Sequence, residues 1–64
     1  MSLAEQIERT GRALTAEDLA RMLSVSKVAI YKYAAEGKIP SFRIGTSLRF
    51  DPHSVAAWLR ARGA

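Results

Sequence analysis

The stretch LTAEDLARMLSVSKVAIYKYAAEGKIP, which runs from Leu14 to Pro40, contains the signals of two short helices joined by a tight turn. Thr15 is a good N-cap, and the two residues after Ala16 are acidic, which suits the positive end of a helix dipole. Leu14 and Leu19 are spaced as a hydrophobic staple around this start. Together these features predict a first helix of about eight residues.

A second helix is predicted after a turn at Ser24 and Val25. Ser26 can cap its start, and Gly37 can end it, because glycine readily adopts the left-handed conformation that follows many helices. The two helices and their turn form a helix-turn-helix unit over residues 14–36. The side chains of the second helix divide between two faces. The face expected to be buried carries Ile30, Tyr33 and Ala34, and the face expected to stay free carries Val28, Tyr31, Lys32 and Ala35.

The free face has the chemistry of a DNA-binding surface. A helix-turn-helix unit presents its second helix to the DNA major groove, which is about 12 Å wide and admits one helix. Lys27 and Lys32 can reach phosphates or the edge of a guanine. Tyr31 can donate to a phosphate, and Val28 can touch a thymine methyl group. The alternative is that the two lysines are only solvated.

Beyond Pro40 the apolar period changes to two, which is typical of strands. Residues 41–50 are predicted to form a hairpin that turns at Gly45-Thr46-Ser47. Its apolar side chains are expected to share one face, and Arg43 and Arg49 are expected side by side on the other. Such a hairpin can act as a wing whose arginines follow DNA phosphates or probe the minor groove. The expected DNA-binding residues are Ser26, Lys27, Val28, Tyr31, Lys32, Lys38, Arg43 and Arg49.

Helices are also predicted at both ends of the chain. A capping box at Ser2 and Glu5 indicates a short helix from residue 3 to about residue 10, within an N-terminal extension of residues 1–12. Asp51 followed by Pro52 predicts a C-terminal helix over residues 52–62. The apolar stripe expected to bury that helix carries Val55, Trp58 and Leu59. The prediction is therefore one domain over residues 1–64, mainly α with a small β-hairpin.

Composition and charge agree with a small DNA-binding domain. The chain has 64 residues and no cysteine, so it must be stabilised by packing and helix caps, without disulfides or thiolate metal sites. Residues 1–19 carry two cations and four acids, a net charge of −2, whereas residues 20–64 carry eight cations and two acids, a net charge of +6. Basic charge concentrated in one part of a small domain favours a polyanionic partner. A merely solubilising surface is the alternative.

The sequence offers little support for catalysis, metal binding or membrane insertion. His53 has no second histidine or cysteine nearby, and Asp51 is better explained as a helix cap than as its catalytic partner. We therefore expect a non-enzyme with no catalytic residues, no metal site and no cofactor. No apolar run approaches the roughly 20 residues of a membrane span, and no signal peptide is evident, so a cytoplasmic location is expected.

Residues 14–59 resemble the excisionase-type winged helix-turn-helix domain of the MerR superfamily. The matching pieces are Leu14-Thr15, Ala20, Val25-Ser26, Ile30-Tyr31, Glu36-Gly37-Lys38-Ile39-Pro40, Arg43-Ile44-Gly45, Asp51 and Trp58-Leu59. The resemblance implies a winged helix-turn-helix fold, DNA binding and no effector pocket, since MerR-type regulators add a dimerisation helix and a ligand domain after this module. Two departures are Ser24, where such turns often carry glycine, and a wing turn that is less basic than many.

The expected partner is double-stranded DNA, bound by an excisionase-like recombination directionality factor or by a small transcriptional regulator. An integrase or other recombinase is the protein partner in the first case, and RNA polymerase in the second. A single module of this kind buries roughly 600–1,000 Å² of protein surface, so we expect repeated copies on DNA or a companion protein. The rival hypothesis is a protein-protein adaptor that docks through Leu3 and Ile7 without direct DNA contact.

Overall fold

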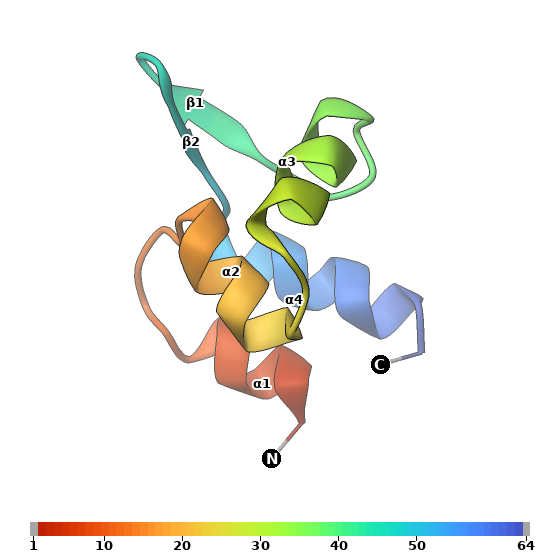
Figure 1. The fold of residues 1–64 in the computed structure, drawn as a ribbon. Helices are drawn as coiled ribbons and strands as arrows, with labels where there is room; N and C mark the ends of the chain where they lie inside the picture. The colour runs from red at the N-terminus through yellow and green to blue at the C-terminus, as the bar shows by residue number, and fades with distance from the viewer. Residues whose placement is uncertain (1, 64) are drawn as a thin grey trace.

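The computed structural model describes residues 2–63. Within them lie four helices and one antiparallel hairpin, which stands away from the helical body beside α3 (Figure 1). The elements in chain order are α1 (Leu3–Glu8), α2 (Ala16–Leu23), α3 (Lys27–Ala35), β1 (Phe42–Ile44), β2 (Ser47–Arg49) and α4 (Pro52–Ala61). The predicted fold class, mainly helical with a small hairpin in a winged helix-turn-helix arrangement, is confirmed.

The helices begin at the residues that the sequence indicates. In α2 the Thr15 hydroxyl accepts from the Asp18 backbone N–H at 3.0 Å, and the Asp18 carboxylate accepts from the Thr15 N–H at 3.2 Å. Ser26 caps α3 by accepting from the N–H of Ala29, and Asp51 caps α4 in the same way. Each cap satisfies a backbone donor that has no partner inside its own helix. The starts of these helices are therefore fixed by local sequence.

The turn between α2 and α3 depends on a serine in a left-handed conformation. Ser24 has φ of 58°, and this bend lets the N–H of Val25 donate to the carbonyl of Ala20 at 3.0 Å. Glycine is usually found at such a position, because a side chain there is strained. The end of α3 follows the more usual pattern, since Gly37 takes the left-handed conformation and Lys38 donates to the carbonyl of Tyr33.

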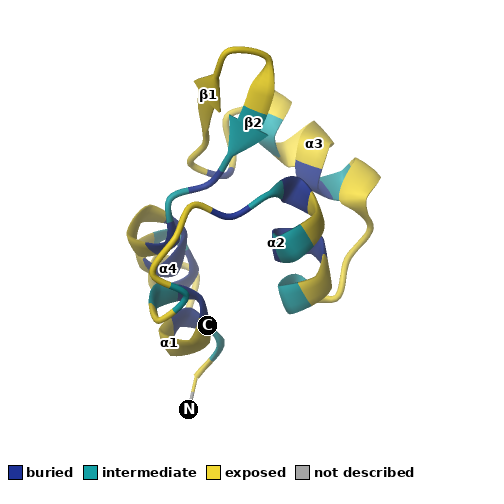
Figure 2. Ribbon diagram, turned by 90° about the vertical axis from the view of Figure 1, so that its left-hand side faces the viewer, coloured by how far each residue is buried: buried dark blue, intermediate teal, exposed yellow. Residues whose placement is uncertain are grey.

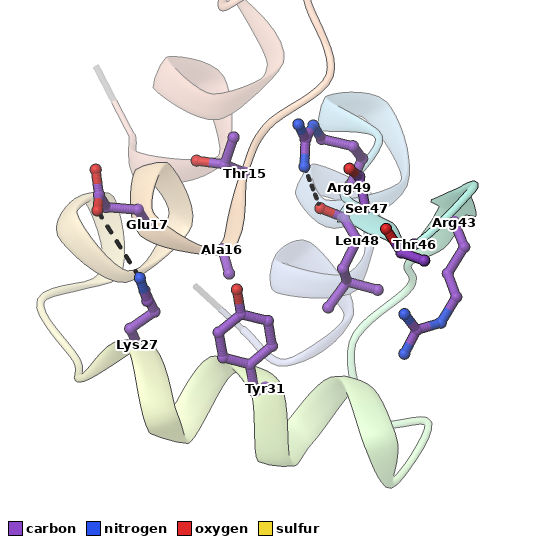
Figure 3. Close-up of a pocket in the computed structure, with 10 residues that line it drawn as sticks. All are labelled: Thr15, Ala16, Glu17, Lys27, Tyr31, Arg43, Thr46, Ser47, Leu48 and Arg49. Atoms are coloured by element: carbon purple, nitrogen blue, oxygen red, sulfur yellow. Dashed lines mark hydrogen bonds and ion pairs between the residues drawn. The ribbon is translucent and has the colours of Figure 1, made fainter.

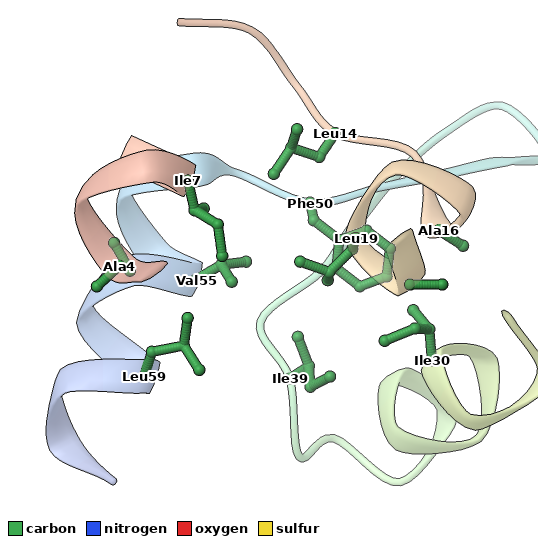
Figure 4. Close-up of a cluster of buried hydrophobic side chains, with 12 residues drawn as sticks. Ala4, Ile7, Leu14, Ala16, Leu19, Ile30, Ile39, Phe50, Val55 and Leu59 are labelled. Carbon is green, nitrogen blue, oxygen red and sulfur yellow. The ribbon is translucent and has the colours of Figure 1, made fainter. Parts of the chain in front are cut away.

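The first part of the core joins the two ends of the chain. Ala4 and Ile7 on α1 have no exposed surface and pack beside Val55 and Leu59 on α4 (Figure 4). The short helix predicted within the N-terminal extension is α1, which lies against α4 as an integral part of the fold. The docking stripe of the rival adaptor hypothesis is therefore not available to a partner, since Ile7 is buried and Leu3 is partly buried against the same cluster.

An ionic contact reinforces the packing of α1 on α4. The Glu8 carboxylate accepts from Arg60 at 2.9 Å and lies 3.3 Å from Nδ1 of His53. The hydrogen bond from Arg60 is the main reason that the pKa of Glu8 is lowered to about 2. The same bond raises the pKa of Arg60. These charges join α1 to α4 and so help to hold the two helices together.

The second part of the core holds the helix-turn-helix unit and the hairpin in place. Its fully or almost fully buried large side chains are Leu14, Leu19, Ile30, Ile39 and Phe50 (Figure 4). Leu14 and Phe50 also exchange two backbone hydrogen bonds, of 2.9 and 2.8 Å, in an isolated antiparallel bridge. This bridge fastens the end of the hairpin to the residue before the N-cap of α2. The hairpin is therefore positioned relative to α2 and α3.

The hairpin has a different register from the one predicted. Phe42 pairs with Arg49, Arg43 with Leu48, and Ile44 with Ser47, so the turn contains only Gly45 and Thr46. Residues that pair across an antiparallel ladder point to the same face, so a turn of two residues rather than three moves every side chain of β2 to the opposite face. Arg43 and Arg49 consequently lie on opposite faces, and the prediction that they lie side by side was wrong.

The same register divides the apolar residues of the hairpin. Leu48 is partly buried against the core and Phe50 is fully buried. Phe42 and Ile44 lie on the other face, with exposed fractions of 40% and 62%. The expected single apolar face therefore does not exist. Leu48 and Phe50 therefore anchor the hairpin to the core, and Phe42 and Ile44 are left on the surface.

Candidate nucleic-acid interface

The interface begins with the side of α3 that the rest of the described chain leaves uncovered. Ile30 is fully buried and fixes the helix against α2, whereas Val28 is 76% exposed and Tyr31 is 48% exposed. Lys32 lies beside them and is also exposed. Figure 2 shows most of the surface of α3 and of the hairpin as exposed, above a buried interior. The face predicted to stay free is thus available to a partner.

Two aromatic side chains differ from the predicted burial. Tyr33 was expected on the buried face, but it is 37% exposed and the Lys38 ammonium lies 5.8 Å from the centre of its ring. Trp58 was expected in the core, but it is only partly buried and is covered by the guanidinium of Arg62 at 4.8 Å. In both cases the aromatic ring lies at the margin of the interior with a cation near its face.

A cleft of about 390 Å³ separates the start of α2 from α3 and the hairpin (Figure 3). Four of the predicted DNA-binding residues line it: Lys27, Tyr31, Arg43 and Arg49. Val28 and Lys32 lie on the exposed surface of the same helix. The structure therefore brings residues from 27 to 49 in sequence onto one side of the molecule, although Arg43 and Arg49 occupy different faces of the hairpin.

The remaining two predicted residues have other contacts. Ser26 is exposed at the start of α3, where its hydroxyl accepts the capping hydrogen bond from Ala29. Lys38 lies beyond the other end of the helix, near Tyr33 and 3.3 Å from the Glu36 carboxylate. Lys38 is therefore the predicted residue with the weakest geometric link to the cleft.

Uncompensated positive charge lies along α3 and the hairpin. Among the described residues, no acidic group lies within 4.0 Å of Lys32, Arg43 or Arg49, whereas Lys27 lies 4.0 Å from Glu17. Arg49 is oriented by donating to the carbonyl of Leu48 at 2.8 Å. Three unpaired cations on one side of a small domain attract phosphates.

Most cations elsewhere are neutralised or occupied. The carboxylate of Asp18 holds Arg12 at 3.0 Å and Arg21 at 2.9 Å. The backbone hydrogen bond from Thr15, followed by the hydrogen bond from Arg12, lowers the pKa of Asp18 to about 2. Asp18 therefore stays ionised and keeps these arginines engaged. Arg9 has no acidic partner within the described chain, but it follows α1, which packs against α4 rather than α3.

Sequence reasoning missed three features of this surface. Glu17 lines the cleft and approaches Lys27, and the exposed side chains of Phe42 and Ile44 stand on the outer face of the hairpin. The length of the turn decides which side chains lie on the outer face. Gly45 has φ of 61°, which suits the first position of a two-residue hairpin turn. The dipeptide Gly45-Thr46 was thus the available signal for the register.

Comparison with known proteins identifies the unit that carries this surface. A family model described as a helix-turn-helix domain matches residues 13–63. The chain belongs to this helix-turn-helix domain family. The match covers α2, α3, the hairpin and α4, and leaves α1 outside. Family membership points to double-stranded DNA as the partner of the helix-turn-helix unit. No curated protein and no solved structure matches the chain significantly.

The described part of this helix-turn-helix protein contains neither a metal-binding cluster nor a membrane-spanning helix. In residues 2–63, no three histidine, cysteine or carboxylate side chains are grouped so that they can hold a metal ion. Over the same range, none of the helices combines the length and the apolar character needed to cross a membrane.

Proposed function

We propose that this protein binds double-stranded DNA in a sequence-specific manner, as an excisionase-like recombination directionality factor or as a small transcriptional regulator. In this proposal α3 enters the major groove and the hairpin lies on the flanking backbone. The observation that carries it is the uncovered side of α3, on which Val28, Tyr31 and Lys32 are exposed next to a cleft lined by two hairpin arginines. Groups for base contact and for phosphate contact are thus adjacent.

The side chains for base contact and those for phosphate contact have different roles. Val28 and Lys32 read base edges, because an exposed aliphatic group fits a thymine methyl and an ammonium fits guanine O6 and N7. Arg43, Arg49 and Lys27 contact phosphates, because they line the cleft between α3 and the hairpin. Tyr31, Ser26 and Lys38 supply further donors to the backbone around α3. The protein acts as repeated copies or beside a recombinase or RNA polymerase, since one such module has limited specificity.

Salt dependence tests the phosphate contacts. If only Lys32, Arg43 and Arg49 contact phosphates, a plot of log affinity against log salt concentration should have a slope of about −2.7. If Lys27 and Lys38 also contact phosphates, the slope should approach about −4.5. Fluorescence anisotropy with a random duplex over a range of salt concentrations measures it. A slope near zero, or no binding at low salt, would contradict direct DNA binding.

Two alanine variants test the division of roles on a duplex obtained by selection from random sequences. Arg49→Ala should weaken binding to all duplexes alike and flatten the salt slope by about 0.9. Lys32→Ala should instead lose about 1–3 kcal/mol of discrimination at one base pair. Arg9→Ala is the matched control, since it removes one charge from the segment after α1 and should leave the slope unchanged. Equal and sequence-independent losses from both test variants would remove Lys32 as a base reader.

The two biological roles require a separate experiment. In a strain that carries a mobile element beside the gene, deletion of the gene should abolish excision of that element if the protein directs recombination. If the protein is a transcriptional regulator, the deletion should change transcript levels near its binding sites while excision continues.

A further inference from the structure

Glu17 is the one acidic residue among those that line the cleft between α2, α3 and the hairpin. Its carboxylate lies 4.0 Å from the ammonium of Lys27, across the gap between α2 and α3 (Figure 3). We propose that Glu17 limits the affinity for DNA by competing with a DNA phosphate for Lys27. This inference rests on the proposed function, because it concerns the same surface.

The capping box at the start of α2 is complete without the carboxylate of Glu17. Thr15 and Asp18 already complete the capping box, and Asp18 also binds two arginines. The side chain of Glu17 makes no hydrogen bond to another described residue, and 73% of its surface is exposed. Its only close polar partner among residues 2–63 is Lys27. The charge of Glu17 also suits the positive end of the α2 dipole, but its one close ionic partner among the described residues is the ammonium of Lys27 in the cleft.

The electrostatic effect follows from the position of the charge. A phosphate that binds Lys27 must displace the carboxylate of Glu17, because both anions are attracted to the same ammonium. Both side chains of the ion pair are more than half exposed, so the pair itself is weak and a phosphate can replace it. When DNA binds, a phosphate replaces Glu17 as the partner of Lys27. The gain in binding free energy is therefore smaller than a free lysine would give. The same competition acts on every DNA sequence, because it involves the backbone.

Replacement of Glu17 by glutamine tests this competition. Glu17→Gln keeps the length of the side chain and removes its charge. Affinity for a random duplex at low salt should rise about three- to tenfold, and the salt slope should steepen by about 0.9, the contribution of one fully available cation. The gain should shrink as added salt screens the attraction between Lys27 and either anion. Glu5→Gln is the control: it changes the net charge equally on α1, and glutamine also serves in a capping box.

A double-mutant cycle tests the role of Lys27. In a Lys27→Met background, Glu17→Gln should raise affinity less than twofold, because the contested cation is absent. Circular dichroism establishes that each variant is folded at the temperature of the assay.

Two outcomes would overturn the inference while leaving DNA binding intact. In the first, Glu17→Gln has no greater effect than Glu5→Gln. In the second, its gain remains threefold or more without Lys27. Failure of the wild-type protein to bind any duplex at low salt would instead overturn the proposed function, and this inference with it.

Discussion

Truncation of Ile7 to alanine tests whether α1 is an integral part of the fold. Ile7 has no exposed surface and packs against α4 (Figure 4). Removing a buried isoleucine side chain down to its Cβ costs about 2–5 kcal/mol, part of it from the cavity that remains. A chain of 64 residues has a free energy of unfolding of roughly 3–10 kcal/mol, at about 0.05–0.15 kcal/mol per residue. The variant should therefore lose a large fraction of its stability.

Urea denaturation followed by circular dichroism and by Trp58 fluorescence measures this loss. In thermal melts the melting temperature should fall by roughly 8–40 °C, since each kcal/mol corresponds to about 4–8 °C in a domain of this size. Ile7→Val should cost only about 0.5–1.5 kcal/mol, which keeps the experiment informative if Ile7→Ala does not fold. Gln6→Ala, on the exposed side of the same helix, is the control and should stay within about 0.5 kcal/mol of wild type. An equally small effect of Ile7→Ala would refute the packing of α1 on α4.

Three further predictions concern the turn, the hairpin and pH. Ser24→Gly should raise stability by about 0.5–1 kcal/mol in thermal melts, because glycine relieves the left-handed strain at φ of 58°; a loss would contradict that strain. Leu48→Ala should destabilise by about 1–2 kcal/mol while Ile44→Ala stays within about 0.5, and the reverse order would contradict the register. The Arg60 hydrogen bond lowers the pKa of Glu8 to about 2 in the folded protein, so the stability from this group is present above its usual value of 4.5 and is lost as pH falls from there towards 2. Glu8→Gln should therefore reduce stability at neutral pH and flatten the acid limb of the stability profile; an unchanged acid limb would refute the assignment.

The exposed side of α3 could be predicted because it depends on the period of one helix. Once Ile30 is buried, helical geometry places Val28, Tyr31 and Lys32 on the other side, whatever the exact packing. The same reasoning fails for Tyr33 and Trp58, which lie near the border between the two faces. Their exposure is decided by how closely neighbouring segments approach, and the sequence pattern does not contain that information.

The hairpin shows how a small local error becomes a large functional one. Counting Ser47 as part of the turn places Arg43 beside Arg49, whereas the observed pairing of Ile44 with Ser47 separates the two arginines. Alternation has a period of two, so a single residue of turn length exchanges the two faces of β2. Sequence reasoning identified the hairpin and its cations but could not assign each cation to a face without the length of the turn.

By itself the sequence determined the features that depend on residues a few positions apart. The caps at Thr15, Ser26 and Asp51 and the division of α3 into two faces are of this kind, since each involves residues within one or two helical turns. Only the tertiary structure decided that α1 belongs to the core, and which cations remain unpaired. Contacts such as Glu8 with Arg60 and Leu14 with Phe50 join segments more than 30 residues apart, and their formation depends on the simultaneous packing of the whole chain.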